Sequence, residues 1–209
     1  MIKRLFDITL SSVGLLVSAP LWVAIPAAIK LEDGGPIMFP QERVGQNGCT
    51  FQALKFRSMV PDAEALSGPV QAREGDPRVT RTGRLLRATA MDELPQLWNI
   101  LVGDMSFVGP RPLRPGEVEV RGDGRFVPLE EIPGYVDRHR VRPGLTGLAQ
   151  VFAARDVRRT SKFRLDRLYI SRSSFRLDLY LILLSFWITA RGAWEKDRSR
   201  DVHRVKQPL

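Results

Sequence analysis

An uncharged stretch of 22 residues, 8–29, constrains this chain more than any other feature of its sequence. A helix of about 20 apolar residues spans the hydrocarbon core of a bilayer, so the length permits a crossing. The apolar part of a cleavable signal peptide is shorter, usually about 7–15 residues. A helix buried in a soluble core is the other alternative, and 22 residues is long for that role. We therefore expect residues 8–29 to enter the membrane.

Two features of this stretch favour a helix that enters and leaves the membrane by one face. Pro20 lies near its middle and Pro26 follows, and each proline removes a backbone donor and bends a helix. Ser18 precedes the break, and its hydroxyl is placed to return a hydrogen bond to a freed carbonyl. Basic residues flank both ends, and positive charge stays on the cytoplasmic side. The sequence predicts a re-entrant helix broken at Ser18 and Pro20, with a single crossing as the alternative.

The charge balance indicates anionic partners. The 209 residues include 32 Lys and Arg against 23 Asp and Glu, a formal net charge of +9. Such a charge suits nucleic acid, acidic lipid headgroups or phosphorylated substrates. The basic residues are interleaved with Pro-Gly loops and carry no helix-turn-helix or RNA-binding signature, so we expect no nucleic acid partner. Cys49 is the only cysteine, which excludes an internal disulfide and a thiolate zinc site.

The rest of the chain predicts an α+β fold that is mostly helical. Residues 36–44 and 49–57 flank a Gly-Gln-Asn-Gly turn, a pattern typical of a β-hairpin. Residues 61–75 and 116–134 indicate loops. The segments with a helical pattern are 82–90, 94–101, 161–171 and 175–193.

Residues 179–190 leave two alternatives open. This uncharged segment has only 12 residues, too few for a helix that crosses a membrane. It fits a buried core helix, or a helix in the membrane interface with Trp187 and Trp194 at the level of the headgroups. We expect a re-entrant membrane helix over 1–31 and a compact cytoplasmic domain over 32–209, with the short hairpin and interfacial helices.

Asp92 and Glu93 are the sharpest local candidates for chemistry. Pro95 is tolerated in the first turn of a helix, so we expect Asp92 near the N-cap. The positive end of the helix dipole would keep that carboxylate ionised and attract anions. The structural alternative is simple, because Asp is a favoured N-cap and Glu a favoured first-turn residue. The helix that follows carries four apolar residues at helical spacing: Leu94, Leu97, Trp98 and Leu101.

A supply of cations on stiff segments favours a phosphate substrate for these carboxylates. Gly and Pro pin the backbone near the cations, a rigidity that a solvated arginine does not need. An ionised carboxylate that attacks a phosphate meets like-charge repulsion, so the site requires positive charge and usually a divalent cation. Mg²⁺ is the expected metal, with Asp92 and Glu93 as its ligands. The candidate phosphate-binding residues are Lys55, Arg57, Arg87, Arg111 and Arg142.

Segments along almost the whole chain match the motifs of one known family, in that family's order. They are 3–7 (KRLFD), 18–20 (SAP), 35–39 (GPIMF), 54–59 (LKFRSM), 92–99 (DELPQLWN), 103–112 (GDMSFVGPRP) and 142–151 (RPGLTGLAQV), followed by Lys162, Phe163, Asp166, Tyr169 and Asp178. The sequence therefore resembles the small monotopic phosphoglycosyl transferases, also called bacterial sugar transferases.

This resemblance implies a re-entrant helix, a catalytic domain on the cytoplasmic face of the bacterial inner membrane, and a ping-pong mechanism. Asp92 falls at the family's nucleophilic aspartate and Glu93 at its essential neighbour. The implied reaction moves a sugar-1-phosphate from a UDP-sugar through an aspartyl intermediate to undecaprenyl (polyprenyl) phosphate, with release of UMP. The product would begin an exopolysaccharide, capsule, O-antigen or glycoprotein glycan. Inner-membrane lipids and downstream glycosyltransferases are the further partners that the resemblance implies.

The sequence also departs from the family pattern at two places. Pro40 stands where the family commonly has a basic residue, and residues 152–154 (FAA) stand where many members carry Asn-Gly-Arg. The second departure affects the identity of the sugar more than the reaction type. The sugar, the glycan pathway and the oligomeric state, a dimer included, stay open. The alternative function is a non-catalytic phosphate- or lipid-binding scaffold at the membrane, which loss of Asp92 would have favoured.

Overall fold

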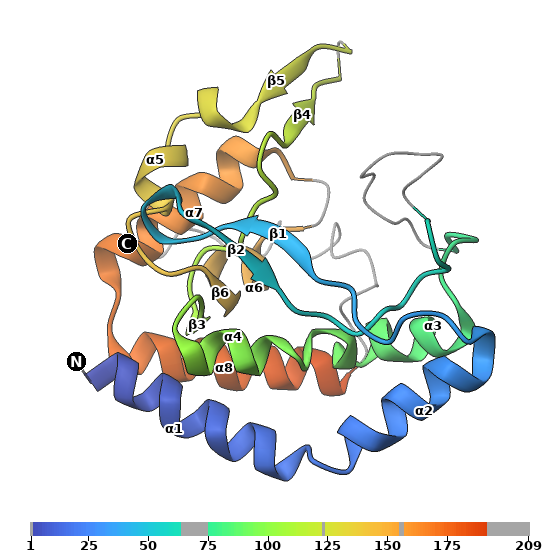
Figure 1. The fold of residues 1–209 in the computed structure, drawn as a ribbon. Helices are drawn as coiled ribbons and strands as arrows, with labels where there is room; N and C mark the ends of the chain where they lie inside the picture. The colour runs from blue at the N-terminus through green and yellow to red at the C-terminus, as the bar shows by residue number, and fades with distance from the viewer. Residues whose placement is uncertain (1, 64–74, 123, 155–156, 192–209) are drawn as a thin grey trace. The chain divides into compact units, whose positions relative to one another are not determined.

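The computed structural model describes residues 2–63, 75–122, 124–154 and 157–191 (Figure 1). Helices predominate, and within these residues the strands pair into three two-stranded sheets, so the α+β class predicted from the sequence is confirmed. The chain divides into two compact units: the first unit is 1–43 and 51–105, and the second is 44–50 and 106–209. The division at residue 31 that we expected concerns the membrane and stays a prediction, since the compact units divide the chain elsewhere.

The N-terminus of the first unit is a bent pair of helices, α1 (Ile2–Val17) and α2 (Leu21–Asp33). The chain bends by 60° between the two helices. Figure 1 shows this bend between α1 and α2. Among the described residues, no single helix is long and apolar enough to cross a membrane, although this pair together meets the criteria of length and composition.

The break lies at residues 18–20, where the sequence predicts it. The Ser18 hydroxyl donates to the Leu15 carbonyl at 3.3 Å and accepts from the Trp22 indole at 3.1 Å. This serine therefore satisfies a carbonyl of the last turn of α1, as expected from its place before the proline. Pro26 does not end a helix, because α2 continues through it.

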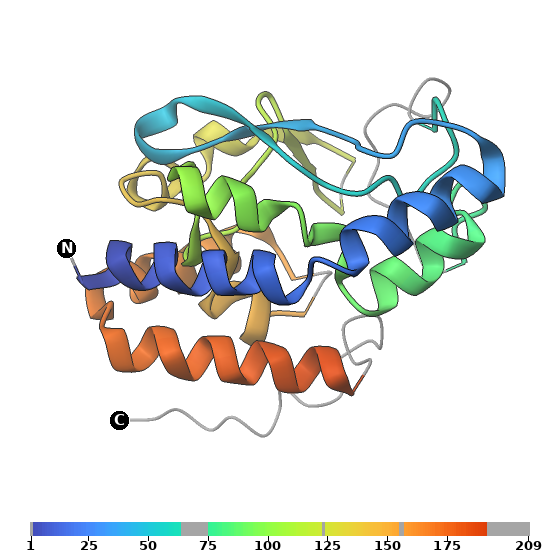
Figure 2. The same ribbon diagram turned by 60° about the horizontal axis from the view of Figure 1, so that its bottom comes forward.

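In the first unit, α4 (Gln96–Val102) packs beside α1, and α3 (Arg81–Ala88) packs beside α2 (Figure 2). Arg4 donates to the carbonyls of Ile100 and Leu101 at 2.6 and 2.7 Å. These carbonyls lie in the last turn of α4, where a cation is favourable because the helix dipole is negative there. The basic residue before the apolar stretch thus fixes the start of α1 to α4.

The apolar face expected for α4 is partly wrong. Leu97 is buried, but Trp98 is 51% exposed, and the fully buried residue is Ile100. The helix is turned because the Asn99 side chain takes a buried position: it donates to the Gln52 carbonyl at 2.8 Å and accepts from a backbone amide of the neighbouring strand segment at 3.0 Å. Buried backbone groups require partners, and here this requirement outweighs the apolar spacing.

The predicted hairpin is confirmed, with shorter strands than expected. β1 (Gln41–Val44) and β2 (Thr50–Ala53) pair across a 3-10 turn at Gln46–Gly48. A bridge between Met38 and Phe56 continues the antiparallel pairing beyond the strands. The 11 residues 64–74, which fall in the loop predicted after this hairpin, lie outside the described residues.

The second unit contains a strand pair that local patterns do not indicate. β3 (Ser106–Val108) and β6 (Gly144–Thr146) pair in parallel, with Ser106 opposite Gly144 and Val108 opposite Thr146. Residues 116–134, expected as a loop, include the antiparallel strands β4 (Val118–Val120) and β5 (Phe126–Pro128), so that expectation is wrong. The β-branched and aromatic residues at these positions favour extended backbone despite the charged residues around them.

The remaining elements of the second unit are helical, and residues of η3, α5 and α7 pack in a small apolar core. The short helical segments are η3 (Leu129–Glu131), α5 (Tyr135–Arg138) and α6 (Leu148–Phe152). The two late helices, α7 (Arg159–Arg172) and α8 (Phe175–Ala190), confirm the helices predicted there. The core residues are Leu113, Leu129, Ile132 and Phe163.

α8 has features of both alternatives that the sequence leaves open. Leu181 and Ile188 are buried, as in a core helix. Large apolar side chains of α8 are also exposed, and they include Phe175, Leu183, Phe186 and Trp187. Trp194, the second expected anchor, lies outside the described residues.

The close approach of α3 to a neighbouring backbone gives a test of the first unit. A Cβ at Gly83 would lie 1.9 Å from the Ser58 carbonyl oxygen, so Gly83→Ala requires α3 to move. We expect it to lower the free energy of unfolding by about 3 kcal/mol, the upper end of the usual cost of overpacking. Thermal unfolding in detergent measures this. Gly122→Ala is the control, because its Cβ would have no neighbour within 4 Å. Equal shifts in the two variants would contradict the close approach.

Candidate active site

Asp92 and Glu93 lie in a short 3-10 turn, η2 (Met91–Glu93). Ala90 precedes it in the left-handed backbone conformation, with φ of 55°. The expectation that Asp92 is near the N-cap of the following helix is wrong, because α4 begins only at Gln96 and Pro95 occupies its N-cap. Pro95 has no N–H and cannot join the helical ladder, so the turn before it stays separate. The acidic pair is therefore held by its own turn and not by the dipole of α4.

The segment before Arg57 fixes both members of this acidic pair, which we call the dyad. The Lys55 Nζ donates to the Glu93 Oε1 at 2.7 Å, and both side chains are largely shielded from solvent. The Phe56 amide donates to the Asp92 carbonyl at 2.9 Å. Two consecutive residues thus attach the dyad to the end of the hairpin, one through a charge and one through the backbone.

Arg57 has protein partners where we expected a phosphate. Its guanidinium is 6% exposed and forms a two-pronged ion pair with Asp33, the last residue of α2. It also donates to the carbonyls of Pro36 at 2.5 Å and Met59 at 3.2 Å. These contacts occupy the donors that a substrate phosphate would need, so the geometry favours a structural role for Arg57.

Arg87 lies in the last turn of α3, and its side chain is half-buried. α3 packs against the turn that carries the dyad, so Arg87 belongs to the same unit as Asp92 and Glu93. Among the described residues, its guanidinium has no hydrogen-bonded or ion-paired partner.

Arg111 and Arg142 lie in the second unit, on two loops whose backbones are in direct contact. The Gly144 amide donates to the Pro110 carbonyl at 2.9 Å, and the Gly109 amide donates to a carbonyl of β6 at the same distance. A Cβ at Gly144 would lie 2.0 Å from the Gly109 nitrogen, so only glycine permits this approach. The two Pro-containing arginine loops are therefore bonded to each other through their backbones, a contact that is not a sequence-based expectation.

A buried guanidinium supports the loop of Arg111 from within. Arg138 is 3% exposed, donates to the Arg111 carbonyl at 2.6 Å and pairs with Asp166 at 2.9 Å. Its charge also lies over the ring of Phe163, 4.8 Å from the centroid. Burial raises the pKa of Asp166, and the charge of Arg138 opposes that rise. The Arg138 guanidinium thus holds the backbone at Arg111, whose side chain is exposed.

The two carboxylates of the dyad suit a Mg²⁺ site in which the phosphates of the substrate supply further ligands. Mg²⁺ at phosphate-transfer sites is commonly held by one or two carboxylates together with substrate phosphates and water. Asp92 and Glu93 supply two carboxylates, and no group of three or more His, Cys, Asp or Glu within the described residues forms a full protein cage. Lys55 competes with a metal for Glu93, because it already pairs with that carboxylate. The donor set therefore suits a metal that arrives with its phosphate ligand.

The structure brings five of the predicted site residues into the first unit and two into the second. Lys55, Arg57, Arg87 and the dyad are in the first unit, while Arg111 and Arg142 are in the second. Sequence reasoning missed the residues that support them: Asp33, Asn99, Arg138 and Asp166. The ion-pair partner of Asp33 is 24 residues away in the sequence, so no local pattern indicates this contact.

An acidic pair that is held by a lysine and by a backbone hydrogen bond is a group suited to chemistry on phosphates. The family model described as bacterial sugar transferase matches residues 1–192, and the chain belongs to this family.

Curated relatives agree with this assignment. The chain is 45% identical over 188 residues to the undecaprenyl-phosphate glucose phosphotransferase of Komagataeibacter xylinus, which covers 88% of this chain and 35% of the relative. It is 41% identical over 186 residues to the exopolysaccharide production protein PSS of Rhizobium leguminosarum bv. phaseoli, covering 87% and 91%. It is 42% identical over 184 residues to the UDP-N-acetylgalactosamine-undecaprenyl-phosphate N-acetylgalactosaminephosphotransferase of Aeromonas hydrophila, covering 87% and 42%. The chain thus spans about a third of the first relative's length and nearly all of the second's.

Acid is expected to destabilise the second unit through His139, the neighbour of Arg138. Burial, assisted by the charge of Arg138, lowers the pKa of His139 from 6.5 to about 4. The fold therefore favours the neutral ring: its stabilising contribution is complete above pH 6.5 and is lost as the pH falls from 6.5 towards 4. The thermal midpoint should fall over this interval, and it should fall less in His139→Asn. Parallel pH profiles for the two proteins would contradict this assignment.

Proposed function

We propose that this protein transfers a sugar-1-phosphate from a UDP-sugar to undecaprenyl phosphate at the cytoplasmic face of the bacterial inner membrane. The observation that carries the proposal is the dyad, with Glu93 paired to Lys55 and Asp92 attached to Phe56, in a chain of the bacterial sugar transferase family. The names of the relatives support undecaprenyl phosphate as the acceptor. They include both glucose and N-acetylgalactosamine transferases, so the proposal stays at the level of a UDP-sugar.

In the first half-reaction, a carboxylate oxygen of Asp92 attacks the phosphorus that bears the sugar. A bond forms between that oxygen and phosphorus, and the bond from phosphorus to the oxygen of the UMP phosphate breaks. UMP leaves with the electron pair. In the second half-reaction, a phosphate oxygen of the lipid attacks the same phosphorus, and the Asp92 carboxylate is released unchanged. Covalent catalysis of this kind divides one difficult transfer into two easier steps.

The cations of the site would offset the repulsion between a carboxylate and a phosphate. Lys55 holds Glu93 beside the nucleophile, and Arg87 retains its donors in the same unit. We assign Arg111 and Arg142 to the phosphates of the substrate, because their loops are fixed by backbone contacts. Asp92 and Glu93 would hold Mg²⁺, which supplies charge neutralisation at the diphosphate when it is bound. We assign Arg57 to the structure and not to the substrate, because its donors are occupied.

The bent helix pair supports the membrane location. α1 exposes large apolar side chains, and the most exposed are Ile2, Leu5, Leu16 and Val17. Basic residues lie at both ends of the pair, and the break has its own hydrogen bonds. We therefore propose that residues 1–31 re-enter on the cytoplasmic face, and that inner-membrane lipids and downstream glycosyltransferases are the neighbours of this enzyme.

The covalent intermediate is the part of the mechanism that an experiment tests most directly. With UDP-sugar and magnesium but no lipid, the enzyme should release at most one UMP per molecule and gain the mass of one phospho-sugar on Asp92. Asp92→Asn should lose the adduct and slow turnover by about 10⁴-fold or more, because an amide is a poor nucleophile. Glu93→Gln should fold and react slowly. Intact-mass spectrometry and a coupled assay for UMP measure both quantities.

The outcome that excludes this mechanism is specific. A quenched reaction without any adduct, together with initial-rate lines that intersect instead of running parallel, would indicate direct transfer in a ternary complex. Asp92 would then not be the nucleophile, although the family assignment would stand.

The topology of the helix pair has a separate test. Cys49 is the only cysteine and is exposed, so a Cys49→Ser background permits a single reporter cysteine at residue 2. We expect this reporter to stay protected from a membrane-impermeant maleimide in intact spheroplasts and to react after lysis. Replacement of Pro20 by Ala should shift the segment towards spanning, since it restores a backbone donor at the break. Labelling of the Pro20-containing protein from outside would establish a crossing.

A further inference from the structure

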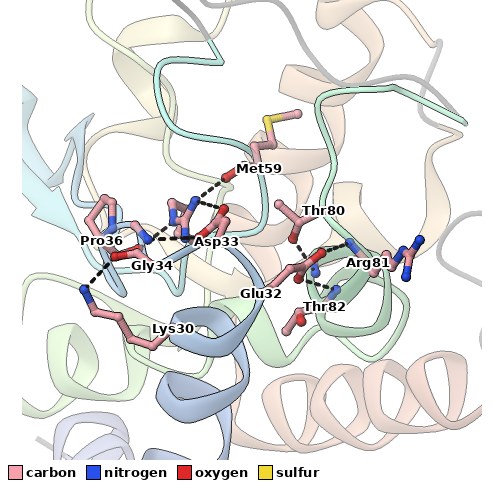
Figure 3. Close-up of polar contacts among 12 residues, drawn as sticks. Lys30, Glu32, Asp33, Gly34, Pro36, Met59, Thr80, Arg81 and Thr82 are labelled. Atoms are coloured by element: carbon pink, nitrogen blue, oxygen red, sulfur yellow. Dashed lines mark hydrogen bonds and ion pairs between the residues drawn. The ribbon is translucent and has the colours of Figure 1, made fainter.

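The acidic end of α2 is bonded to the start of α3 and to Arg57 (Figure 3). Glu32 and Asp33 are adjacent in sequence, yet their carboxylates contact different elements. Glu32 reaches the start of α3, and Asp33 reaches Arg57. Both elements precede the dyad in the chain: α3 leads into its turn, and the segment of Arg57 is bonded to it.

Glu32 fixes the N-terminus of α3. Its Oε1 accepts from the Arg81 amide at 2.7 Å, and its Oε2 accepts from the Thr82 amide at 2.9 Å. Amides of the first helical turn have no partner within the helix, so an external carboxylate satisfies them. The helix also has its own cap, the Thr80 hydroxyl, which accepts from the Gly83 amide at 2.9 Å. The end of α2 therefore sets where α3 begins.

Asp33 fixes the Arg57 segment. The carboxylate binds both terminal nitrogens of the guanidinium and accepts from the Gly35 amide at 3.0 Å. A Cβ at Gly35 would lie 2.9 Å from the guanidinium carbon, so the turn after α2 wraps closely around this charge. Arg57 is anchored on its other side by the carbonyls of Pro36 and Met59. The pair has little freedom to move independently of α2.

α2 also makes apolar contacts with the Arg57 segment and with α3. Ile25 and Ile29 on α2 are buried against Phe56 and Leu86, and the ring of Trp22 lies 5.4 Å from that of Phe56. The residues on either side of the dyad, Met91 and Leu94, also pack on this cluster.

We propose that Asp33, acting through Arg57, is a positioning residue for the dyad, so that the seating of α2 sets the geometry of Asp92 and Glu93. The three consecutive residues of segment 55–57 carry the connection: Lys55 binds Glu93, Phe56 binds Asp92, and Arg57 binds Asp33. A displacement of Arg57 is transmitted to the Phe56 amide one residue away. The catalytic meaning rests on the proposed function, whereas the mechanical connection does not.

The connection is intact throughout the range in which an enzyme is assayed. Hydrogen bonding from Arg57, with further help from the Gly35 amide and the charges of Arg57 and Lys30, lowers the pKa of Asp33 from 3.8 to about 2. The pair therefore contributes fully above pH 3.8 and is lost only as the pH falls through about 2. The effect of removing the Asp33 charge should thus be the same at neutral and alkaline pH.

The decisive measurement is single-turnover release of UMP by Asp33→Asn, with UDP-sugar and magnesium and without lipid. The amplitude counts folded sites, and the rate constant reports how well the dyad is placed. We expect a rate constant lower by about 10- to 100-fold, as for a displacement of up to 1 Å, with the amplitude per folded molecule unchanged. A purely structural role would lower the amplitude and leave the rate constant unchanged.

Asp76→Asn is the matched control. It removes a carboxylate from a second Asp–Arg pair of the same unit, Asp76–Arg78, which joins residues only two positions apart. We expect it to leave the rate constant at the wild-type value. An equal loss of rate in Asp33→Asn and Asp76→Asn, or no loss in Asp33→Asn, would overturn the proposal.

Hydrogen exchange gives a readout that needs no activity. Exchange of the Phe56 amide, which is bonded to the Asp92 carbonyl, should accelerate at least about tenfold in Asp33→Asn and stay unchanged in Asp76→Asn. If the wild-type protein releases no UMP, the proposed function fails, and this exchange alone decides the positioning role. If Asp33→Asn does not fold, Glu32→Gln decides it: a lower rate constant at full amplitude supports the connection through the end of α2, and a wild-type rate constant rejects it.

Discussion

The guanidinium of Arg57 imposes a constraint that the first unit is built around. Its side chain is 6% exposed, and a charge that is buried without partners costs several kcal/mol. Its acceptors come from three places: the end of α2, the turn that follows, and the chain just beyond Arg57 itself. These segments must therefore converge on the guanidinium in the folded unit, beside the apolar cluster of α2 and α3. The dyad is bonded to the same segment, so the ion pair of Arg57 also fixes the position of the dyad.

The second unit reaches a similar rigidity by the opposite means. Its two arginine loops touch through backbone atoms, and glycines at 109, 144 and 147 leave no side chain between them. Arg138, paired with Asp166, then holds the carbonyl of Arg111 from the interior. Tyr169 makes a comparable link, with its hydroxyl 2.7 Å from Asp178 and 3.1 Å from the Val108 carbonyl. Residues that match the family's late helices are thus the ones that hold β3 and its loop in place.

Local patterns predicted what depends on near neighbours in the chain. The break at Ser18 and Pro20, the hairpin and the late helices follow from proline chemistry, a turn signal and helical spacing. The strands β3 to β6 have three residues each, which is too short for any periodicity. The partner of β3, β6, also lies far along the chain, whereas β4 and β5 are neighbours in sequence. The sequence indicated the two carboxylates of the dyad. The prediction that Asp92 lies near the N-cap of the following helix was wrong, because Pro95 separates the turn of the dyad from α4.

The roles of the arginines also show that local patterns do not reveal the partners of a side chain. Five basic residues on stiff segments were candidates for phosphate, and sequence alone gives them equal standing. Only the three-dimensional partner separates them: Arg57 has Asp33, whereas Arg87 and Arg142 have no hydrogen-bonded or ion-paired partner among the described residues. Rigidity of the backbone predicts that a cation is held in place, but it does not tell whether a ligand or another residue holds it. Asn99 was missed for a related reason, because a buried amide that replaces backbone partners resembles any polar residue on a helix.

The residue before the dyad has a consequence for how this enzyme could vary. Ala90 adopts φ of 55° and ψ of 18°, a conformation that glycine adopts freely and that costs a residue with a Cβ about 1 kcal/mol or more. Selection for heat resistance alone would therefore favour glycine at this position. Glycine would also widen the range of conformations open to the turn, and the two carboxylates would be oriented less precisely. At this one residue, the stability of the fold and the precise orientation of the carboxylates favour different residues, and the alanine of this chain favours the orientation.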